Sequence, residues 1–206
     1  MTRPNLALVS MAQTPRPHTR GEYLRDWFTI KEDAPVLTPR VCEDIGTLVV
    51  TDTENKLSIS GGALVCAGGK ATTAYGDPKI LSSRSYTVGY GMAFDAEVKP
   101  TSTVLWGDVG FYATATPTAS TDRFSIRFNN DATISFQDKD NPITPEPGLM
   151  PFVANTSYWI RVLCKAAGKN YYYSLDGGMT WYLIWSSLLT TTVELWAGYV
   201  NASLPF

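Results

Sequence analysis

Histidine and cysteine, on which most nucleophilic triads and zinc sites depend, are scarce in this sequence. His18 is the only histidine, and it lies in a proline-rich stretch near the start of the chain. The three cysteines, Cys42, Cys66 and Cys164, share no short spacing. A catalytic triad needs a positioned histidine, and a zinc site or disulfide framework needs closely spaced or paired residues. The sequence therefore predicts none of these sites. Cys66 and Cys164 lie in apolar runs, so we expect them to be buried and reduced.

Charged residues and long apolar runs are also sparse. Asp, Glu, Lys and Arg make up 17% of the 206 residues, and the formal net charge is -2. This balance argues against a partner held by bulk positive charge, whether a nucleic acid or an anionic membrane. No apolar run approaches the 18 or more residues of a membrane span. The apolar run over residues 6–12 is at the lower limit for a signal peptide, so the sequence predicts no convincing secretion signal.

Runs with the alternating pattern of β-strands follow one another from residue 26 onward. In AFDAEVKP, apolar residues Phe94, Ala96 and Val98 alternate with charged ones. RFSIRF and TISFQD flank an Asn-Asn-Asp turn and form a legible hairpin. No helical pattern of credible length competes with these strands. The sequence predicts an all-β fold, a two-sheet antiparallel β-sandwich of the jelly-roll kind with an extended N-terminal arm.

The predicted arm covers residues 1–21, and the predicted β-sandwich domain covers residues 22–206. The arm contains three prolines, three arginines and the single histidine, and its first acidic residue is Glu22, just beyond it. Proline blocks both helix and sheet, so an extended conformation is expected. Two interpretations remain open: a disordered terminus, or an arm that runs along a neighbouring subunit. The apolar segment LALVSMA favours the second.

The octapeptide SLDGGMTW, residues 174–181, has the composition of a tight structural turn. Its side chains suit that role: Asp176 can accept backbone N–H bonds, and Gly177 and Gly178 can adopt positive φ. Trp181 can fold back as an apolar lid. The residues assigned to this turn motif are Ser174, Asp176, Gly178, Thr180 and Trp181. The octapeptide also fits the Asp-box pattern S-x-D-x-G-x-T-W, of which sialidase propellers carry several copies together with an arginine cluster. This chain has one box and no such cluster, so a sialidase is not predicted.

The segments YWIRV, YYYS and DGGMTW, with KLSISGGALVCAGG upstream, resemble the concanavalin A-like lectin/glucanase domains, the LamG-like jelly rolls found in phage and surface proteins. The resemblance covers about residues 26–200 and implies a lectin-like β-sandwich. Glucanases on this fold carry a Glu-x-Asp-x-x-Glu strand, which is absent here, and no enzyme activity is therefore expected. A further strand would normally follow TVELWAGYV. The N-terminal arm, a neighbouring chain or additional C-terminal residues could each fill that place.

Four residues are candidates for carbohydrate binding, because sugar rings stack on exposed aromatic rings beside polar groups. They are Trp106, Asp108, Tyr171 and Tyr173. Weak candidates for calcium are Asp138, Asp140 and Asn141, which offer the oxygen ligands that calcium prefers, although Asx-rich turns occur without metal. No cofactor other than calcium is expected.

Asp95 and Glu97 form the best candidate pair for acid/base chemistry, since residues i and i+2 of a strand share a face. A solvated outer face, which Lys99 continues, explains the same pattern without chemistry. We therefore expect no catalytic residues.

These observations predict a non-catalytic, lectin-like β-sandwich that acts as a structural or adhesion module of a multi-subunit surface assembly, for example a capsid-decorating or tail-associated protein of a phage virion. The expected partners are other subunits, reached through the N-terminal arm and forming a homo-oligomer or larger assembly, and a cell-surface glycan. A free-standing carbohydrate-binding module is the alternative function, and a glycoside hydrolase ranks third.

Overall fold

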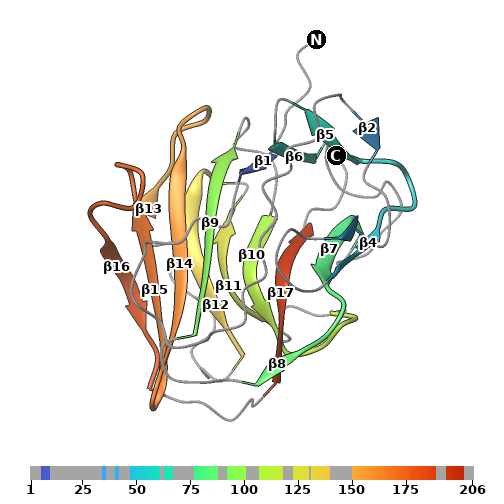
Figure 1. The fold of residues 1–206 in the computed structure, drawn as a ribbon. Helices are drawn as coiled ribbons and strands as arrows, with labels where there is room; N and C mark the ends of the chain where they lie inside the picture. Colours follow the sequence, from blue (N-terminus) through green and yellow to red (C-terminus); the bar gives the residue numbers. More distant parts are fainter. Residues whose placement is uncertain are drawn as a thin grey trace.

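The structure is a computed structural model that describes residues 6–9, 34–35, 40–41, 47–60, 63–66, 77–87, 92–100, 107–117, 123–129, 131–139, 150–188 and 194–201. Every regular element in these ranges is a β-strand, and all strand pairs are antiparallel. The strands form two sheets that pack face to face (Figure 1). The predicted all-β sandwich is therefore confirmed. In the described residues no helix is long and apolar enough to cross a membrane.

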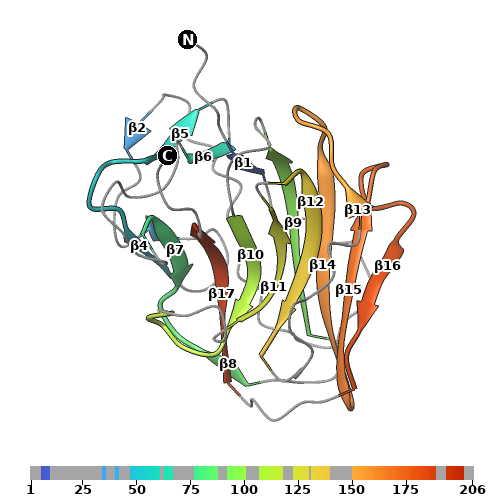
Figure 2. The same ribbon diagram turned by 180° about the vertical axis from the view of Figure 1, so that it is seen from behind.

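The first sheet, called sheet A, contains eight strands. Figures 1 and 2 show β16 at one side of the molecule and β2 at the opposite side. In spatial order the strands of sheet A are β16 (Tyr182–Ser186), β15 (Gly168–Ser174), β14 (Tyr158–Lys165), β9 (Ala93–Pro100), β1 (Leu6–Val9), β6 (Ala63–Cys66), β5 (Leu57–Ser60) and β2 (Ala34–Pro35).

The second sheet, called sheet B, contains nine strands. Eight of them follow one another as β13 (Met150–Pro151), β12 (Thr133–Asp138), β11 (Arg123–Phe128), β10 (Gly107–Tyr112), β17 (Glu194–Asn201), β7 (Lys79–Ser82), β4 (Thr47–Thr51) and β3 (Arg40–Val41). The ninth, β8 (Tyr86–Thr87), pairs with β17. Strand β17, which contains the segment ELWAGYV, is thus paired with β10 on one side and with β7 on the other. Both of its edges are therefore occupied by strands of this chain.

Strand β1 lies in the interior of sheet A, between β9 and β6. It pairs with β9 from Leu6↔Pro100 to Val9↔Glu97, and with β6 from Leu6↔Cys66 to Leu8↔Leu64. The structure places this part of the predicted arm inside the sheet. The remainder of residues 1–21 lies outside the described residues.

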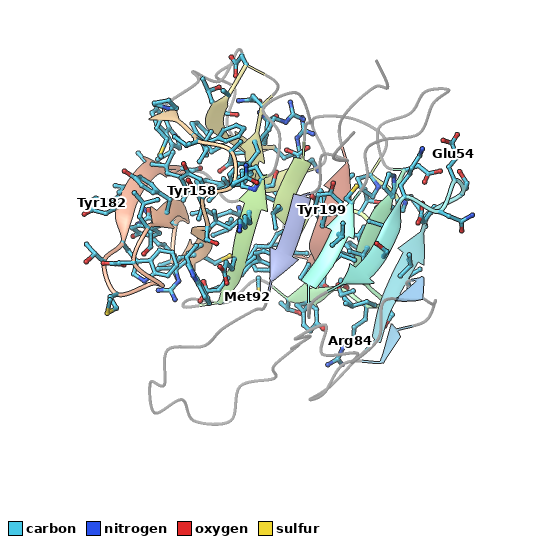
Figure 3. The ribbon with its side chains drawn as sticks, turned by 90° about the horizontal axis from the view of Figure 1, so that it is seen from above. Glu54, Arg84, Met92, Tyr158, Tyr182 and Tyr199 are labelled. Atoms are coloured by element: carbon cyan, nitrogen blue, oxygen red, sulfur yellow. The ribbon has the colours of Figure 1, made fainter. Side chains whose placement is uncertain are left out.

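The core consists of the facing sides of the two sheets. The alternation predicted for residues 93–100 is confirmed, because Phe94, Ala96 and Val98 are buried and their charged neighbours are not. Phe94 of sheet A contacts Phe111 of sheet B edge to face, with ring centroids 5.8 Å apart, which joins the sheets by an aromatic contact. Figure 3 looks along the sandwich and shows Tyr199, another core residue, in the middle of the molecule.

The predicted hairpin is also confirmed. Strands β11 and β12 pair through Ile126↔Phe136 and Phe128↔Ile134, all of which are buried. Strands β14 and β15 are joined by a turn at residues 166–167. Strand β15 begins at Gly168, and the backbone of Lys169 exchanges two hydrogen bonds with that of Ser187.

Two of the three cysteines, Cys66 and Cys164, lie in the described residues, where both are buried, as predicted, and form no disulfide. Burial raises the pKa of the Cys164 thiol to about 11, so it stays protonated and unreactive at neutral pH. Cys42 lies outside the described residues.

Candidate functional site

The four residues predicted to bind carbohydrate do not form one surface. Trp106 lies outside the described residues. Asp108 is on the outer face of sheet B, whereas Tyr171 and Tyr173 lie on β15 in sheet A. The ring of Tyr171 is fully buried in the core, packed against Phe136, so the structure corrects the expectation that this ring is exposed. The sequence does not distinguish the buried ring from the half-buried ones, because three successive tyrosines stand at residues 171–173 of β15.

Asp108 is the centre of a buried polar cluster that spans β10, β11 and β12. Its carboxylate accepts hydrogen bonds from Arg123 Nη1 at 2.6 Å, from Arg127 Nε at 2.9 Å and from Arg127 Nη2 at 3.0 Å. Arg123 also donates two hydrogen bonds to Gln137 Oε1, at 3.1 and 2.7 Å. The side chains of Asp108 and Arg123 are fully buried, and 12% of the Arg127 side chain is exposed.

This cluster connects three neighbouring strands by side chains as well as by the backbone ladder. A carboxylate buried against two guanidinium groups is stable only because its oxygen atoms are saturated by these donors. Asp108 is therefore a structural anchor in this geometry, rather than an accessible ligand for a sugar. The sequence does carry a signal for the cluster: in RFSIRF, the residues that alternate with the three apolar core residues are Arg123, Ser125 and Arg127.

A second buried polar group lies inside the sandwich, between β12 and β15. Tyr171 Oη donates a hydrogen bond to Asp138 Oδ2 at 2.7 Å. The Lys169 ammonium nitrogen lies 3.8 Å from the centroid of the Phe124 ring, and its side chain is fully buried. Cation–π contact partly replaces the water that a buried ammonium group loses. Asp138 is thus engaged inside the protein, and the other two calcium candidates, Asp140 and Asn141, lie outside the described residues. The described residues contain no group of acidic, histidine or cysteine side chains arranged to hold a metal ion.

Asp95, one member of the predicted acid/base pair, forms a bidentate salt bridge with Arg161 on the outer face of sheet A. Arg161 Nε and Nη2 donate to the two carboxylate oxygens of Asp95 at 2.7 and 2.6 Å. The guanidinium carbon of Arg161 also lies 4.2 Å from the centroid of the Trp181 ring. Asp95 therefore holds Arg161 in place, and Arg161 holds the Trp181 ring over the sheet.

The predicted turn at residues 174–181 has the internal bonding expected of it. Ser174 Oγ donates to Asp176 Oδ1 at 2.7 Å and accepts from the Gly178 amide at 3.0 Å, while the Thr180 amide donates to Asp176 Oδ1 at 2.8 Å. Gly177 and Gly178 adopt positive φ. The Trp181 ring packs against Gly178. Hydrogen bonding from Ser174, followed by that from Thr180, lowers the pKa of the Asp176 carboxyl to about 2.

Replacing Ser174 by alanine is expected to raise the pKa of Asp176 toward the 3.8 of an unperturbed aspartate, because the largest stabiliser of the carboxylate is removed. A folded-state pKa below the unfolded value means that Asp176 contributes stability above about pH 4, and that this contribution is lost as the pH falls through about 2. A carbon-13 NMR titration of the side-chain carboxyl checks the midpoint. Ser186→Ala, which leaves the turn intact, is the control. An unchanged Asp176 midpoint in Ser174→Ala would contradict the role of this hydroxyl.

Exposed apolar side chains gather on and beside β16. In the described part of the chain, seven large apolar side chains are exposed, and five of them lie between residues 175 and 188. We call these five the β16 apolar surface: Leu175, Met179, Tyr182, Leu183 and Leu188, with exposed fractions from 50% to 83%. Figure 3 shows Tyr182 at the outer margin of the molecule. Sequence reasoning missed this surface, since WYLIW is equally typical of a core strand.

Strand β16 is an edge strand that pairs only with β15 among the described strands. The register passes from Tyr171↔Trp185 to Tyr172↔Leu183, which leaves Ile184 as an extra residue, a β-bulge. Ile184 and Trp185 both pack against the core. Tyr173, the fourth predicted carbohydrate-binding residue, stacks on Tyr182 with ring centroids 5.2 Å apart. The core thus holds β16 firmly, and the neighbouring side chains remain exposed.

Comparisons with known proteins do not extend the sequence resemblance, which stays a prediction. No family model matches this chain, and no curated protein matches it in sequence.

Proposed function

We propose that this protein is a non-catalytic structural module that associates with copies of itself in a multi-subunit surface assembly, such as a virion. The observation that carries the proposal is the β16 apolar surface. Its five side chains lie on the edge strand β16 or on the segments that directly precede and follow it, whereas Val49 and Val153, the other exposed large apolar residues in the described part of the chain, lie on or beside β4 and β13. Clustered exposed apolar groups mark interaction sites, because covering them removes apolar area from water.

The composition around this surface favours a second protein surface as the partner. Residues 177–193 contain no Asp, Glu, Lys or Arg. Proteins commonly protect an edge strand with charged side chains, and β16 has none. Two such surfaces can therefore meet without repulsion between like charges, and without burying an unpaired charge. The bulge at Ile184 interrupts the regular edge, so side-chain packing, rather than extension of the sheet, is the expected mode of contact.

Light scattering on the full chain tests this proposal. We expect the wild type to be oligomeric, and Leu183→Lys and Met179→Lys each to weaken association at least about tenfold, since each places a charge in a buried contact. Both residues are exposed in the single chain, so the variants are expected to remain folded. Val153→Lys, at a position 65% exposed outside the surface, is the matched control. A wild type that stays monomeric at all concentrations would rule out self-assembly through β16.

Carbohydrate binding is a second candidate, and one observation favours it. Tyr182 is 50% exposed and rests on Tyr173, so its outer side offers a supported aromatic platform of the kind on which sugars stack. A glycan array separates the two functions, because a glycan-binding module should show binding that Tyr182→Ala removes.

A further inference from the structure

Strand β1 has an unusual place for the first described strand of the chain. It separates two groups of strands in sheet A, namely β16, β15, β14 and β9 on one side and β6, β5 and β2 on the other. Both of its edges are paired, with β9 and with β6. Neither neighbouring group pairs with the other in the described strands, so the continuity of sheet A depends on four residues, Leu6–Val9.

The register shows why this position needs a strand. Leu8 is opposite Val98 on β9 and opposite Leu64 on β6, and both of those side chains are buried in the core. Without β1, β9 and β6 would each present an unpaired backbone edge next to these core residues. Buried backbone groups without partners are costly, so the position between β9 and β6 is a built acceptor for one antiparallel strand.

The connection between β1 and the next described strand is long enough to supply this strand from another chain. Residues 10–33, which separate β1 from β2, number 24. Fully extended, these 24 residues span about 80 Å. A globular chain of 206 residues has a radius of gyration of only about 17 Å. The same strand can therefore reach the acceptor position of a neighbouring copy and make the same contacts there, which is the requirement for domain swapping.

We propose that β1 is exchanged between two copies of this protein: Leu6–Val9 of each copy pairs between β9 and β6 of the other. The inference rests on the proposed self-assembly, because exchange needs a high local concentration of copies. A strand joined to its own acceptor by a short connection is present there at about millimolar effective concentration. Dilute chains therefore close on themselves, and exchanged pairs form when chains fold at or above that concentration, as in an assembly.

A native cysteine allows a direct test, because Leu6 is directly opposite Cys66. Paired antiparallel residues have Cα atoms about 4.5–5.5 Å apart, which is within the range that a disulfide spans. The full-length Leu6→Cys variant is refolded at about 1 µM and at about 1 mM, on either side of the effective concentration. It is then oxidised, and its disulfides are assigned on non-reducing gels and by peptide mass mapping. Ala7→Cys is the matched control, since its partners in the register are Val65 and Lys99.

We expect the disulfide to Cys66 to be within one chain in at least about nine-tenths of molecules at the low concentration, and to link two chains in about half of them at the high concentration. Ala7→Cys should form neither. Disulfides to Cys66 that stay within one chain at both concentrations would overturn the exchange, as would the absence of any disulfide to Cys66. If light scattering at the same time shows oligomers that depend on Leu183, the assembly function stands and only the exchange is rejected.

Discussion

Replacing Asp108 by asparagine is expected to lower the free energy of unfolding by about 3–5 kcal/mol. The substitution preserves the size of the side chain and removes its charge. It leaves the guanidinium groups of Arg123 and Arg127 without the carboxylate that both contact, and Arg123 is fully buried. A buried cation that loses its counter-ion keeps the full cost of leaving water. Urea unfolding monitored by tryptophan fluorescence measures the change.

Two controls separate this effect from the loss of any ion pair. Asp95→Asn removes the carboxylate that pairs with Arg161, but there the side chains are 13% and 20% exposed, so a loss of only about 1 kcal/mol is expected. Replacing the cluster together, as Asp108→Leu with Arg123→Met and Arg127→Leu, removes the charges along with their partner and should recover at least about half of the loss. A single Asp108→Asn variant as stable as Asp95→Asn would show that the cluster does not anchor the sheet.

Local alternation in the sequence was sufficient to predict the core face of those strands in which apolar residues recur at every second position. In β9 and in the β11–β12 hairpin, apolar residues at every second position are the ones that are buried. The turn at residues 174–181 could be predicted equally well, because its hydrogen bonds join residues at most four positions apart. Features of this kind depend on neighbours in the sequence, so a single sequence contains them.

Features that depend on distant pairing could not be predicted in the same way. Nothing near Leu6–Val9 indicates that this segment pairs with β9 and β6, about 60 to 90 residues further along. Asp108 and Tyr171 were expected to be accessible because the carboxylate of an aspartate and the hydroxyl of a tyrosine are usually in contact with water. Their burial follows from the arginines of β11 for the first, and from Asp138 and Phe136 for the second.

The edge strand β16 shows a third limit of sequence reasoning. Its residues YLIWS do not alternate, because the bulge at Ile184 turns two successive apolar side chains to the core and leaves Leu183 exposed. A bulge is set by the partner strand, so its position is not readable from β16 alone. The candidate assembly surface was therefore invisible until the pairing of β15 with β16 was known.

Gly198→Ala is expected to lower the free energy of unfolding by about 3 kcal/mol or more, because the interior of sheet B has no space for a methyl group there. A Cβ atom at Gly198 would lie 2.0 Å from the carbonyl oxygen of Ile80 on β7, far inside the contact distance. That oxygen belongs to the backbone of a paired strand, so relief requires moving β7 or β17. On the β10 side of β17, Gly198 is opposite Gly110. A Cβ atom built on Gly110 would likewise lie 2.7 Å from a backbone oxygen, that of Phe124. The clash therefore cannot be relieved by a change of rotamer.

Gly177→Ala is the matched control for this substitution, and thermal or urea unfolding of both variants makes the comparison. Gly177 has a positive φ of 73°, and nothing lies within 4 Å of the position that its Cβ would occupy. Its replacement therefore costs only the strain of the left-handed backbone, about 1 kcal/mol. A loss at Gly198 that clearly exceeds the loss at Gly177 attributes the difference to the φ of 157° at Gly198 together with the crowding between β17 and β7 that this conformation causes. Equal losses would mean that sheet B can open locally at this row, which would contradict the close packing of its central strands.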